Sequence, residues 1–164
     1  MKLIENIPLD TKAIADLITG QNDLHLVWPM AKYPFDHSQW EKALDPEEGN
    51  RSFFVYEGNL RVGHAALRTT DNPKVYAVSF LYLIPDMRSK GLGQGITEFL
   101  ERYARERLSA TKLILVVRTY NLSALKCYNK CGFGEDSREG TLIRMSKVLT
   151  VPAESGKTSL NYSS

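Results

Sequence analysis

The 164-residue chain has little cysteine, and this scarcity bounds both its compartment and its chemistry. Its two cysteines, Cys127 and Cys131, lie four residues apart in a helical pattern, where a disulfide is geometrically awkward. Free thiols are typical of a reducing compartment, so we expect a cytoplasmic protein. A metal site would need more soft ligands near these cysteines, and because the sequence offers none we expect no metal.

The chain also lacks a large net charge and a long hydrophobic run. Its formal net charge of +2 is too small to indicate a nucleic-acid or membrane partner. No apolar run is long enough to span a bilayer, and the segment from Met1 to Asn6 lacks the apolar core of a signal peptide. We therefore expect a soluble protein that needs neither nucleic acid nor a membrane as a partner.

The length of the chain suits one domain with its own hydrophobic core. We predict that this domain covers residues 1–149. Residues 150–164 are rich in Ser, Thr, Gly and Asn, and we predict that they form a flexible polar tail.

Hydrophobic periodicity predicts alternating strands and helices over the domain. Strands are expected over 2–9, 51–57, 60–69, 75–84 and 112–117, with a final hairpin from 133 to 149. Helices are expected over 11–19 and over 121–130. Another helix is expected to begin after the turn that ends at Gly93 and to run to about Leu108. The strand over 75–84 is apolar on both faces, so we expect it in the middle of the sheet. Together with the next helix and the strand over 112–117 it predicts a βαβ unit.

The segment over 21–50 is the least regular part of the chain. We expect one helix in it, capped by Asp36 or Ser38. Trp28 and Trp40 are expected either to pack in the core or to form a wall that faces the substrate, and the two roles are compatible.

The stretch from residue 75 to 98 has the features of a phosphate-binding site. Its apolar strand ends at Pro85, and a basic turn with two glycines then leads into a helix. The first N–H groups of a helix lack intrahelical partners, and the helix dipole adds partial positive charge there. Glycine lets the backbone approach an anion closely, and Arg88 and Lys90 add full positive charges.

Three interpretations compete for this turn. A dinucleotide-binding motif would need its third glycine one residue later than Gly95. It would also follow an early strand of the domain, whereas three strands are expected before the strand over 75–84. A Walker phosphate loop would need Gly-Lys-Ser/Thr at its end, which is absent. A plain strand–helix connection with glycines is the third interpretation, and the turn alone does not exclude it.

A second motif further along the chain narrows this choice. Residues 88–93, Arg-Ser-Lys-Gly-Leu-Gly, match the Arg/Gln-x-x-Gly-x-Gly/Ala signature of the GNAT superfamily of N-acetyltransferases. Residues 121–133 are similar to the later motif of that family, Asn-x-x-Ala-x-x-x-Tyr-x-x-x-Gly-Phe. The order of elements from residue 2 to about 149 also resembles the family. The resemblance implies a single α/β (α+β) domain, with a mixed, mostly antiparallel sheet of six or seven strands, splayed at its centre, and helices on both faces.

The resemblance implies that acetyl-CoA is the co-substrate and lies where the strand over 75–84 splays from the next parallel strand. A bulge in the first of these strands is expected to open the gap. The residues that match the family's donor site are Leu81, Tyr82, Leu83, Arg88, Ser89, Lys90, Gly91, Leu92, Gly93, Asn121 and Lys130. The strand residues are expected to pair with the pantetheine amides, and the turn is expected to hold the pyrophosphate. Asn121 is expected near the pantetheine arm, and Lys130 or Lys126 near the adenosine 3′-phosphate.

The resemblance also implies the reaction, in which an amine attacks the bound thioester directly. Tyr128 matches the general acid of the family, which gives a proton to the leaving CoA sulfur. The alternative role for Tyr128 is an aromatic anchor between helix and sheet. Cys127 is an unattractive acyl-enzyme nucleophile, because no obvious activating base flanks it.

The general base is left unassigned by the sequence. Many relatives carry a glutamate at the position of Ser79, and a serine alone cannot act as a base at neutral pH. Ser79 can instead order a water that relays the proton. His64, Tyr82 and Glu41 are the other options, although a single histidine on a strand is more often structural.

The acceptor is expected to be a primary amine of a small molecule or a peptide. Four aromatic residues of the irregular segment suggest a partly apolar acceptor pocket: Trp28, Tyr33, Phe35 and Trp40. Five acidic residues flank this wall and either attract a cation or form a solvated face: Asp23, Asp36, Glu41, Glu47 and Glu48. The sequence leaves the oligomeric state open, although a homodimer is one possibility, because members of the family that the chain resembles often pair through their C-terminal strands. The rival function is a non-catalytic acyl-CoA-binding regulatory module that has kept the phosphate turn.

Overall fold

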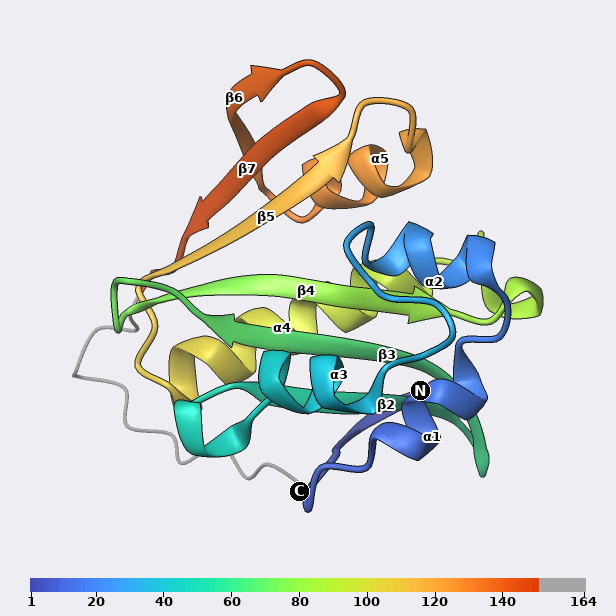
Figure 1. Ribbon diagram of the computed structural model, residues 1–164. Helices are drawn as coiled ribbons and strands as arrows, with labels where there is room; N and C mark the ends of the chain where they lie inside the picture. Colours follow the sequence, from blue (N-terminus) through green and yellow to red (C-terminus); the bar gives the residue numbers. More distant parts are fainter. Residues whose placement is uncertain (151–164) are drawn as a thin grey trace.

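The computed structural model describes residues 1–150, which form a seven-stranded mixed sheet with helices on both faces (Figure 1). The strands are β1 (Lys2–Glu5), β2 (Arg51–Glu57), β3 (Leu60–Thr69), β4 (Val75–Leu83), β5 (Lys112–Arg118), β6 (Gly134–Glu139) and β7 (Leu142–Val148). The α-helices are α1 (Thr11–Leu17), α2 (Gln21–Val27), α3 (His37–Ala43), α4 (Leu92–Arg107) and α5 (Leu122–Lys130). Two short 3-10 helices, η1 (Pro46–Glu48) and η2 (Pro85–Met87), complete the order. The expected fold class is confirmed.

The helices begin where the sequence provides caps. Asp10 accepts a hydrogen bond from the Ala13 N–H at the start of α1, and Asp36 accepts one from the Gln39 N–H at the start of α3. Asn121 caps α5 in the same way. These side chains satisfy N–H groups that have no partner inside the helix, which fixes where each helix starts.

The N-terminal predictions need three corrections. The strand predicted over 2–9 ends at Glu5, because Asn6 turns the chain through a 3.0 Å hydrogen bond from the Asp10 N–H to its side chain. The helix predicted over 11–19 ends at Leu17, and Gly20 then adopts a φ of +88° that a helix cannot contain. Helix α2 follows at once and was not predicted, because a seven-residue helix with one buried residue gives little periodicity.

The strand order in the sheet is β1-β2-β3-β4-β5-β7-β6, so β4 is central as predicted. All neighbouring pairs are antiparallel except β4 and β5, which are parallel. Helix α4 connects these two strands and completes the predicted βαβ unit. The parallel pairing is short, because it joins only Val75–Ala77 to Lys112–Ile114. Beyond these residues the two strands diverge, as Figure 1 shows.

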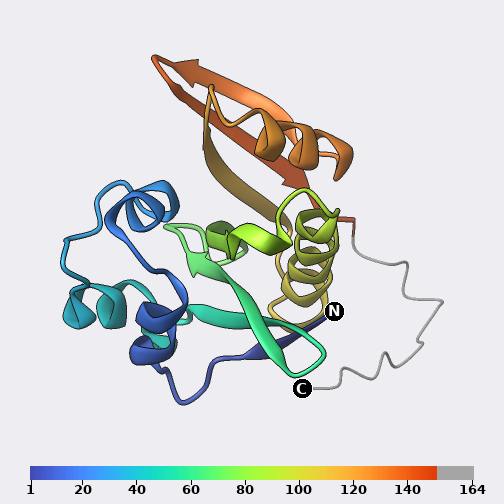
Figure 2. The same cartoon turned by 90° about the vertical axis from the view of Figure 1, so that its right-hand side faces the viewer.

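The two faces of the sheet carry separate cores. Helices α1, α2 and α3 cover one face, and α4 and α5 lie on the other (Figure 2). Trp40, Ile14 and Phe80 belong to the core under α1–α3, and Ile96, Leu100 and Phe53 belong to the core under α4. None of the helices within residues 1–150 is both long and apolar enough to cross a membrane. The predicted flexible tail over 150–164 lies, apart from Thr150, outside the described residues.

Candidate active site

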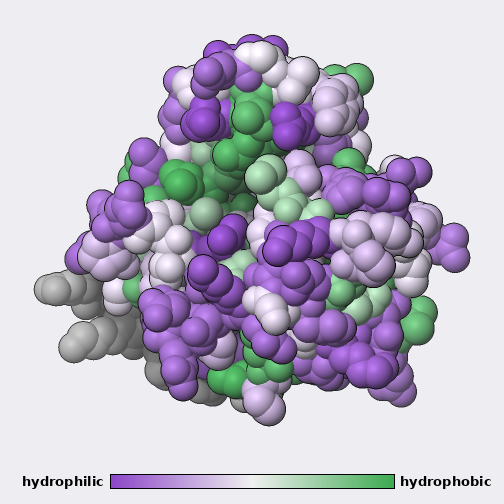
Figure 3. All heavy atoms as spheres, viewed as in Figure 1, coloured by the Kyte–Doolittle hydropathy of each residue, from purple (hydrophilic) through white to green (hydrophobic). Residues whose placement is uncertain are grey.

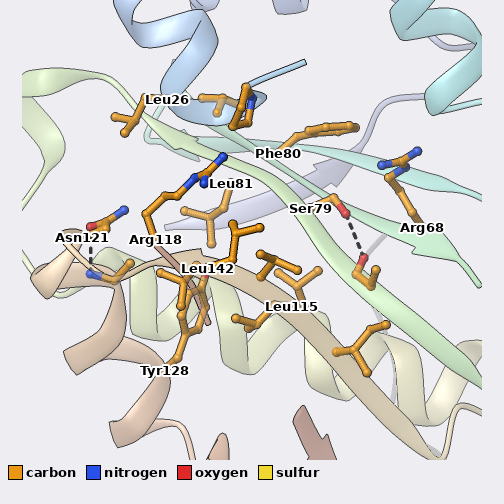
Figure 4. A pocket seen from close by; sticks show the side chains of 18 residues that line it. Leu26, Arg68, Ser79, Phe80, Leu81, Leu115, Arg118, Asn121, Tyr128 and Leu142 are labelled. Carbon is orange, nitrogen blue, oxygen red and sulfur yellow. Dashed lines mark hydrogen bonds between the residues drawn. The ribbon is translucent and has the colours of Figure 1, made fainter. Parts of the chain in front are cut away.

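A cleft opens where β4 and β5 diverge. It encloses a cavity of about 390 Å³. Figure 3 shows apolar surface in a hollow beneath the part of the sheet that contains β5 to β7. The residues that line the cavity are Leu26, Val27, Pro29, Arg68, Ala77, Val78, Ser79, Phe80, Leu81, Ile114, Leu115, Val116, Val117, Arg118, Asn121, Ala124, Tyr128 and Leu142 (Figure 4). Most come from the two diverging strands, α2 and α5, with Arg68 from β3 and Leu142 from β7.

A bulge in β4 forms one wall of the cleft. The register with β3 moves from Ala66↔Ser79 to His64↔Tyr82, so β4 has one more residue than β3 over this step. Phe80 lies in the bulge with a φ of +51°, which is uncommon for a large side chain. The bulge expected from the family resemblance is therefore present in β4.

A chain of buried hydrogen bonds holds the bulge. The Nδ1 of His64 lies 2.9 Å from the Phe80 carbonyl, and its Nε2 lies 2.7 Å from the Ser52 Oγ. Because a carbonyl can only accept, Nδ1 carries the ring proton and the Ser52 hydroxyl donates to Nε2. Asn6 in turn donates to Ser52 Oγ at 3.2 Å. This chain ties the turn after β1 to the bulge across β2 and β3.

His64 does not fit the role of general base. Its side chain is fully buried, both ring nitrogens are occupied, and burial lowers its pKa to about 4. It does not line the cavity. Its role in this structure is to position the Phe80 carbonyl, which agrees with the structural alternative.

Tyr128 reaches the cleft from α5. Its ring packs edge-on against Phe133 with the ring centres 5.7 Å apart, so it also anchors the helix to the sheet. Within residues 1–150 no hydrogen bond to its hydroxyl is present. Burial raises the pKa of Tyr128 far above the ordinary value of a phenol, and this keeps the group protonated at neutral pH. A protonated phenol in the cleft is a proton donor.

The neighbouring thiols are poor nucleophiles. Burial is the main cause that raises the pKa of Cys127, and it raises the pKa of Cys131 to about 11. A thiolate, and not a thiol, attacks a thioester. Cys127 packs near Gly93 of α4 and does not line the cavity. The raised pKa values therefore disfavour an acyl-enzyme intermediate on Cys127.

The predicted phosphate turn has a backbone shaped for close approach. Ser89 and Gly91 both have positive φ, 60° and 80°, and Gly91 immediately precedes α4. The Arg88 side chain points back, where its Nε donates to the Leu83 carbonyl at 2.9 Å and its Nη2 lies 3.3 Å from Asp23. The Arg88 N–H donates to the Pro85 carbonyl at 3.2 Å, and the Arg88 charge is paired with Asp23 of α2.

The structure brings together only some of the residues predicted from the sequence. Ser79, Leu81, Asn121 and Tyr128 line the cavity, and Ser79 Oγ donates to the Ala77 carbonyl at 3.3 Å. Several predicted residues lie outside the lining of the cavity: Tyr82, Leu83, Arg88, Ser89, Lys90, Gly91, Leu92, Gly93 and Lys130. The Tyr82 hydroxyl instead donates to Asp23 at 2.8 Å, and burial together with this bond raises its pKa to about 12.

The predicted acceptor wall is mainly a packed core. Trp28, Trp40 and Phe80 contact one another with ring centres 4.8 to 5.1 Å apart, and Trp40 is fully buried. Phe35 stacks on Trp40, whereas Tyr33 is exposed. Helix α2 contributes Leu26 and Val27 to the cavity, and no residue of the predicted acidic set lines it.

Sequence reasoning missed two arginines in the cleft, Arg68 and Arg118. Arg118 ends the apolar run of β5, where a charge usually marks the solvated end of a strand. Arg68 is the penultimate residue of β3, and its position gives no stronger signal. The pairing of β5 beside the diverging β4, which a sequence pattern does not show, places both side chains at one cavity.

Comparisons with known proteins agree with this architecture. The model of the acetyltransferase (GNAT) family matches residues 16–133. No curated protein matches the chain. The spermidine N-acetyltransferase of Vibrio cholerae in complex with CoA and spermine is 18% identical, with a TM-score of 0.75 over 92% of this chain and 96% of that chain. The N-acetyltransferase PseH of Campylobacter jejuni in complex with acetyl coenzyme A is 21% identical, with a TM-score of 0.67 over 91% of this chain and 99% of that chain.

Proposed function

This chain belongs to the acetyltransferase (GNAT) family, and from that membership we propose that it transfers an acetyl group from acetyl-CoA to a primary amine by direct attack. The observation that carries the proposal is the divergence of β4 from β5 beyond Ala77 and Ile114. Similar structures hold CoA or acetyl coenzyme A, which supports the choice of donor.

The cleft suits the pantetheine arm for a physical reason. Past Ala77, the edge of β4 that faces β5 has no ladder partner, so backbone N–H and C=O groups there are available. An extended amide chain can add to such an edge like another strand. The apolar lining, which includes Leu81, Leu115 and Ala124, suits the methylene groups of the arm. The backbone of Arg88 to Gly93 would hold the pyrophosphate at the start of α4.

Tyr128 supplies the proton in this mechanism. When the amine attacks the thioester carbon, the C–S bond breaks and negative charge develops on the CoA sulfur. The protonated Tyr128 phenol donates its proton to that sulfur, so that free CoA leaves as a thiol. The proton of the amine passes to water, and Ser79, which lines the cavity, would order that water.

The test is a thiol-release assay with acetyl-CoA, a panel of primary amines and the full chain. We expect amine-dependent release and a mass gain of one acetyl group on the amine. Tyr128→Phe should lower kcat by about 100-fold or more with little change in KM. Tyr120→Phe is the matched control, because Tyr120 is exposed and does not line the cavity.

Two results would contradict the proposal. If CoA binds in a calorimetric titration but no amine is acetylated, the rival role of a non-catalytic acyl-CoA-binding module gains support. If kcat is unchanged in Tyr128→Phe under conditions where chemistry limits the rate, Tyr128 is an anchor and not the acid.

A further inference from the structure

We propose that the acceptor amine also carries an oxyanion group, a carboxylate or a phosphate, that Arg118 binds this group, and that Arg68 adds positive charge to the same cavity. The inference rests on the proposed acetyl transfer and names the substrate class of the same cleft. It follows from the charges that line the cavity, from the partners of the two arginines, and from the direction in which Arg118 extends.

The charges that line the cavity have one sign. Of the 18 lining residues, Arg68 and Arg118 are the charged ones, and none is Asp or Glu. A substrate with several ammonium groups would meet two guanidinium groups and no carboxylate, which is unfavourable at short range. A substrate with an oxyanion beside its amine would instead find complementary charge.

Neither arginine has a carboxylate partner within residues 1–150. The Nη1 of Arg118 donates to the Thr141 Oγ1 at 3.0 Å, and no carboxylate lies within ion-pair distance of this side chain. The Nε of Arg68 donates to the Ala43 carbonyl at 3.2 Å. The remaining N–H groups of both guanidinium groups are therefore available to a ligand.

Five other arginines form ion pairs with carboxylates: Arg51, Arg88, Arg105, Arg138 and Arg144. Within residues 1–150, Arg61 and Arg102 also form no ion pair, but neither lines the cavity. The two arginines of the cleft differ from these five because they have no carboxylate partner within residues 1–150. Arg68 is also partly removed from water. Burial lowers the pKa of Arg68, and its guanidinium lies 5.0 Å from the centre of the Phe80 ring. A partly desolvated cation without a counter-ion gains most from an anionic ligand.

The position of Arg118 separates the oxyanion from the reacting amine. Figure 4 shows the Arg118 side chain extending from the end of β5 toward Leu26 of α2, away from Tyr128. Arg68 lies beyond Phe80, on the side of Ser79. An oxyanion held at this mouth leaves the deeper part of the cleft, beside Tyr128, for the amine and the thioester.

The experiment compares acceptors that differ only in the oxyanion. Phenylalanine is paired with phenylalaninamide, and phosphoethanolamine with ethanolamine, while spermidine represents a polycation. We expect the anionic member of at least one pair to have a kcat/KM about 10-fold or more above its neutral partner. The pair that shows the preference identifies the oxyanion as a carboxylate or a phosphate.

Arginine variants test which side chains cause the preference. Arg118→Gln should reduce the kcat/KM for the anionic acceptor by about 10-fold or more and leave its neutral partner nearly unchanged. Arg68→Gln should have a smaller effect in the same direction, because Arg68 adds charge to the cavity from the far side of Phe80, and Arg118→Gln keeps the test valid if Arg68→Gln does not fold. Arg138→Gln is the control, because Arg138 is exposed on β6 and outside the cleft.

The outcomes distinguish this inference from the proposed function. Acetylation of neutral amines or spermidine in preference to the anionic members, with Tyr128-dependent thiol release, overturns the oxyanion inference alone. An equal loss on both members of a pair in Arg118→Gln also overturns it. Release of no thiol with any acceptor overturns the acetyl transfer and, with it, the inference.

Discussion

The buried His64 predicts how the stability of the protein depends on pH. Its folded-state pKa is lowered from 6.5 to about 4 by burial. Above pH 6.5 the imidazole is neutral in both the folded and the unfolded chain, and it adds no pH dependence. Between pH 6.5 and about 4 only the unfolded chain binds the proton, so the free energy of unfolding falls as the pH falls. At about 1.4 kcal/mol for each pH unit, the loss due to this group reaches about 3 kcal/mol.

The perturbation is His64→Gln, which keeps a polar side chain in the buried chain of hydrogen bonds but does not titrate. The free energy of unfolding in urea is measured for the wild type and for the variant at several pH values from 7.5 to 4. The difference between the two proteins at each pH cancels the titration of all other groups. We expect the stability advantage of the wild type to shrink by about 3 kcal/mol as the pH falls through this range. A difference that stays constant with pH would refute the lowered pKa and the neutral, carbonyl-bound imidazole.

Three further predictions follow from the fold. Tyr82→Phe removes the 2.8 Å hydrogen bond to Asp23. The amide hydrogens of α2 should then exchange faster, because the free energy of opening this helix falls by about 1–2 kcal/mol. Unchanged exchange would show that this bond does not hold the helix. Gly63→Ala should lower the free energy of unfolding, measured by urea unfolding, by about 1–3 kcal/mol, because the added Cβ would lie 2.5 Å from the Tyr82 carbonyl oxygen. Wild-type stability would mean that β3 and β4 can separate there at no cost. Trp40→Ala should lower the free energy of unfolding by about 3–5 kcal/mol in the same assay, since the ring is fully buried. A loss below about 1 kcal/mol, as for a surface substitution, would contradict its central place in the core under α1–α3.

The parts of the fold that the sequence predicts best are those with long apolar patterns. Helix α4 and strands β3 and β5 each have enough buried positions to give a clear period. The caps Asp36 and Asn121 were visible as residue types that favour helix starts. Helix α2 was not visible, because its position depends on Asp23 contacts with Tyr82 and Arg88, which are distant in sequence.

The candidate site was predictable only in part for a similar reason. Tyr128, Asn121 and Leu81 follow from motifs in the sequence, and the cavity contains all three. Arg118 and Arg68 enter the site because two strands diverge, and the length of the β4–β5 pairing is a tertiary property. The structure also removes His64 from the candidates for the general base, because its hydrogen bond to the Phe80 carbonyl accounts for its buried position without a role in catalysis.

The central claim is that acetyl-CoA binds where β4 and β5 diverge. The most direct measurement is a crystal structure of the full chain with bound CoA. We predict that the pantetheine arm lies along Leu81 to Leu83, with the sulfur beside the Tyr128 hydroxyl and the pyrophosphate at the N–H groups of Arg88 to Gly93. CoA bound elsewhere on the protein, with the cleft between the two strands empty, would contradict the account.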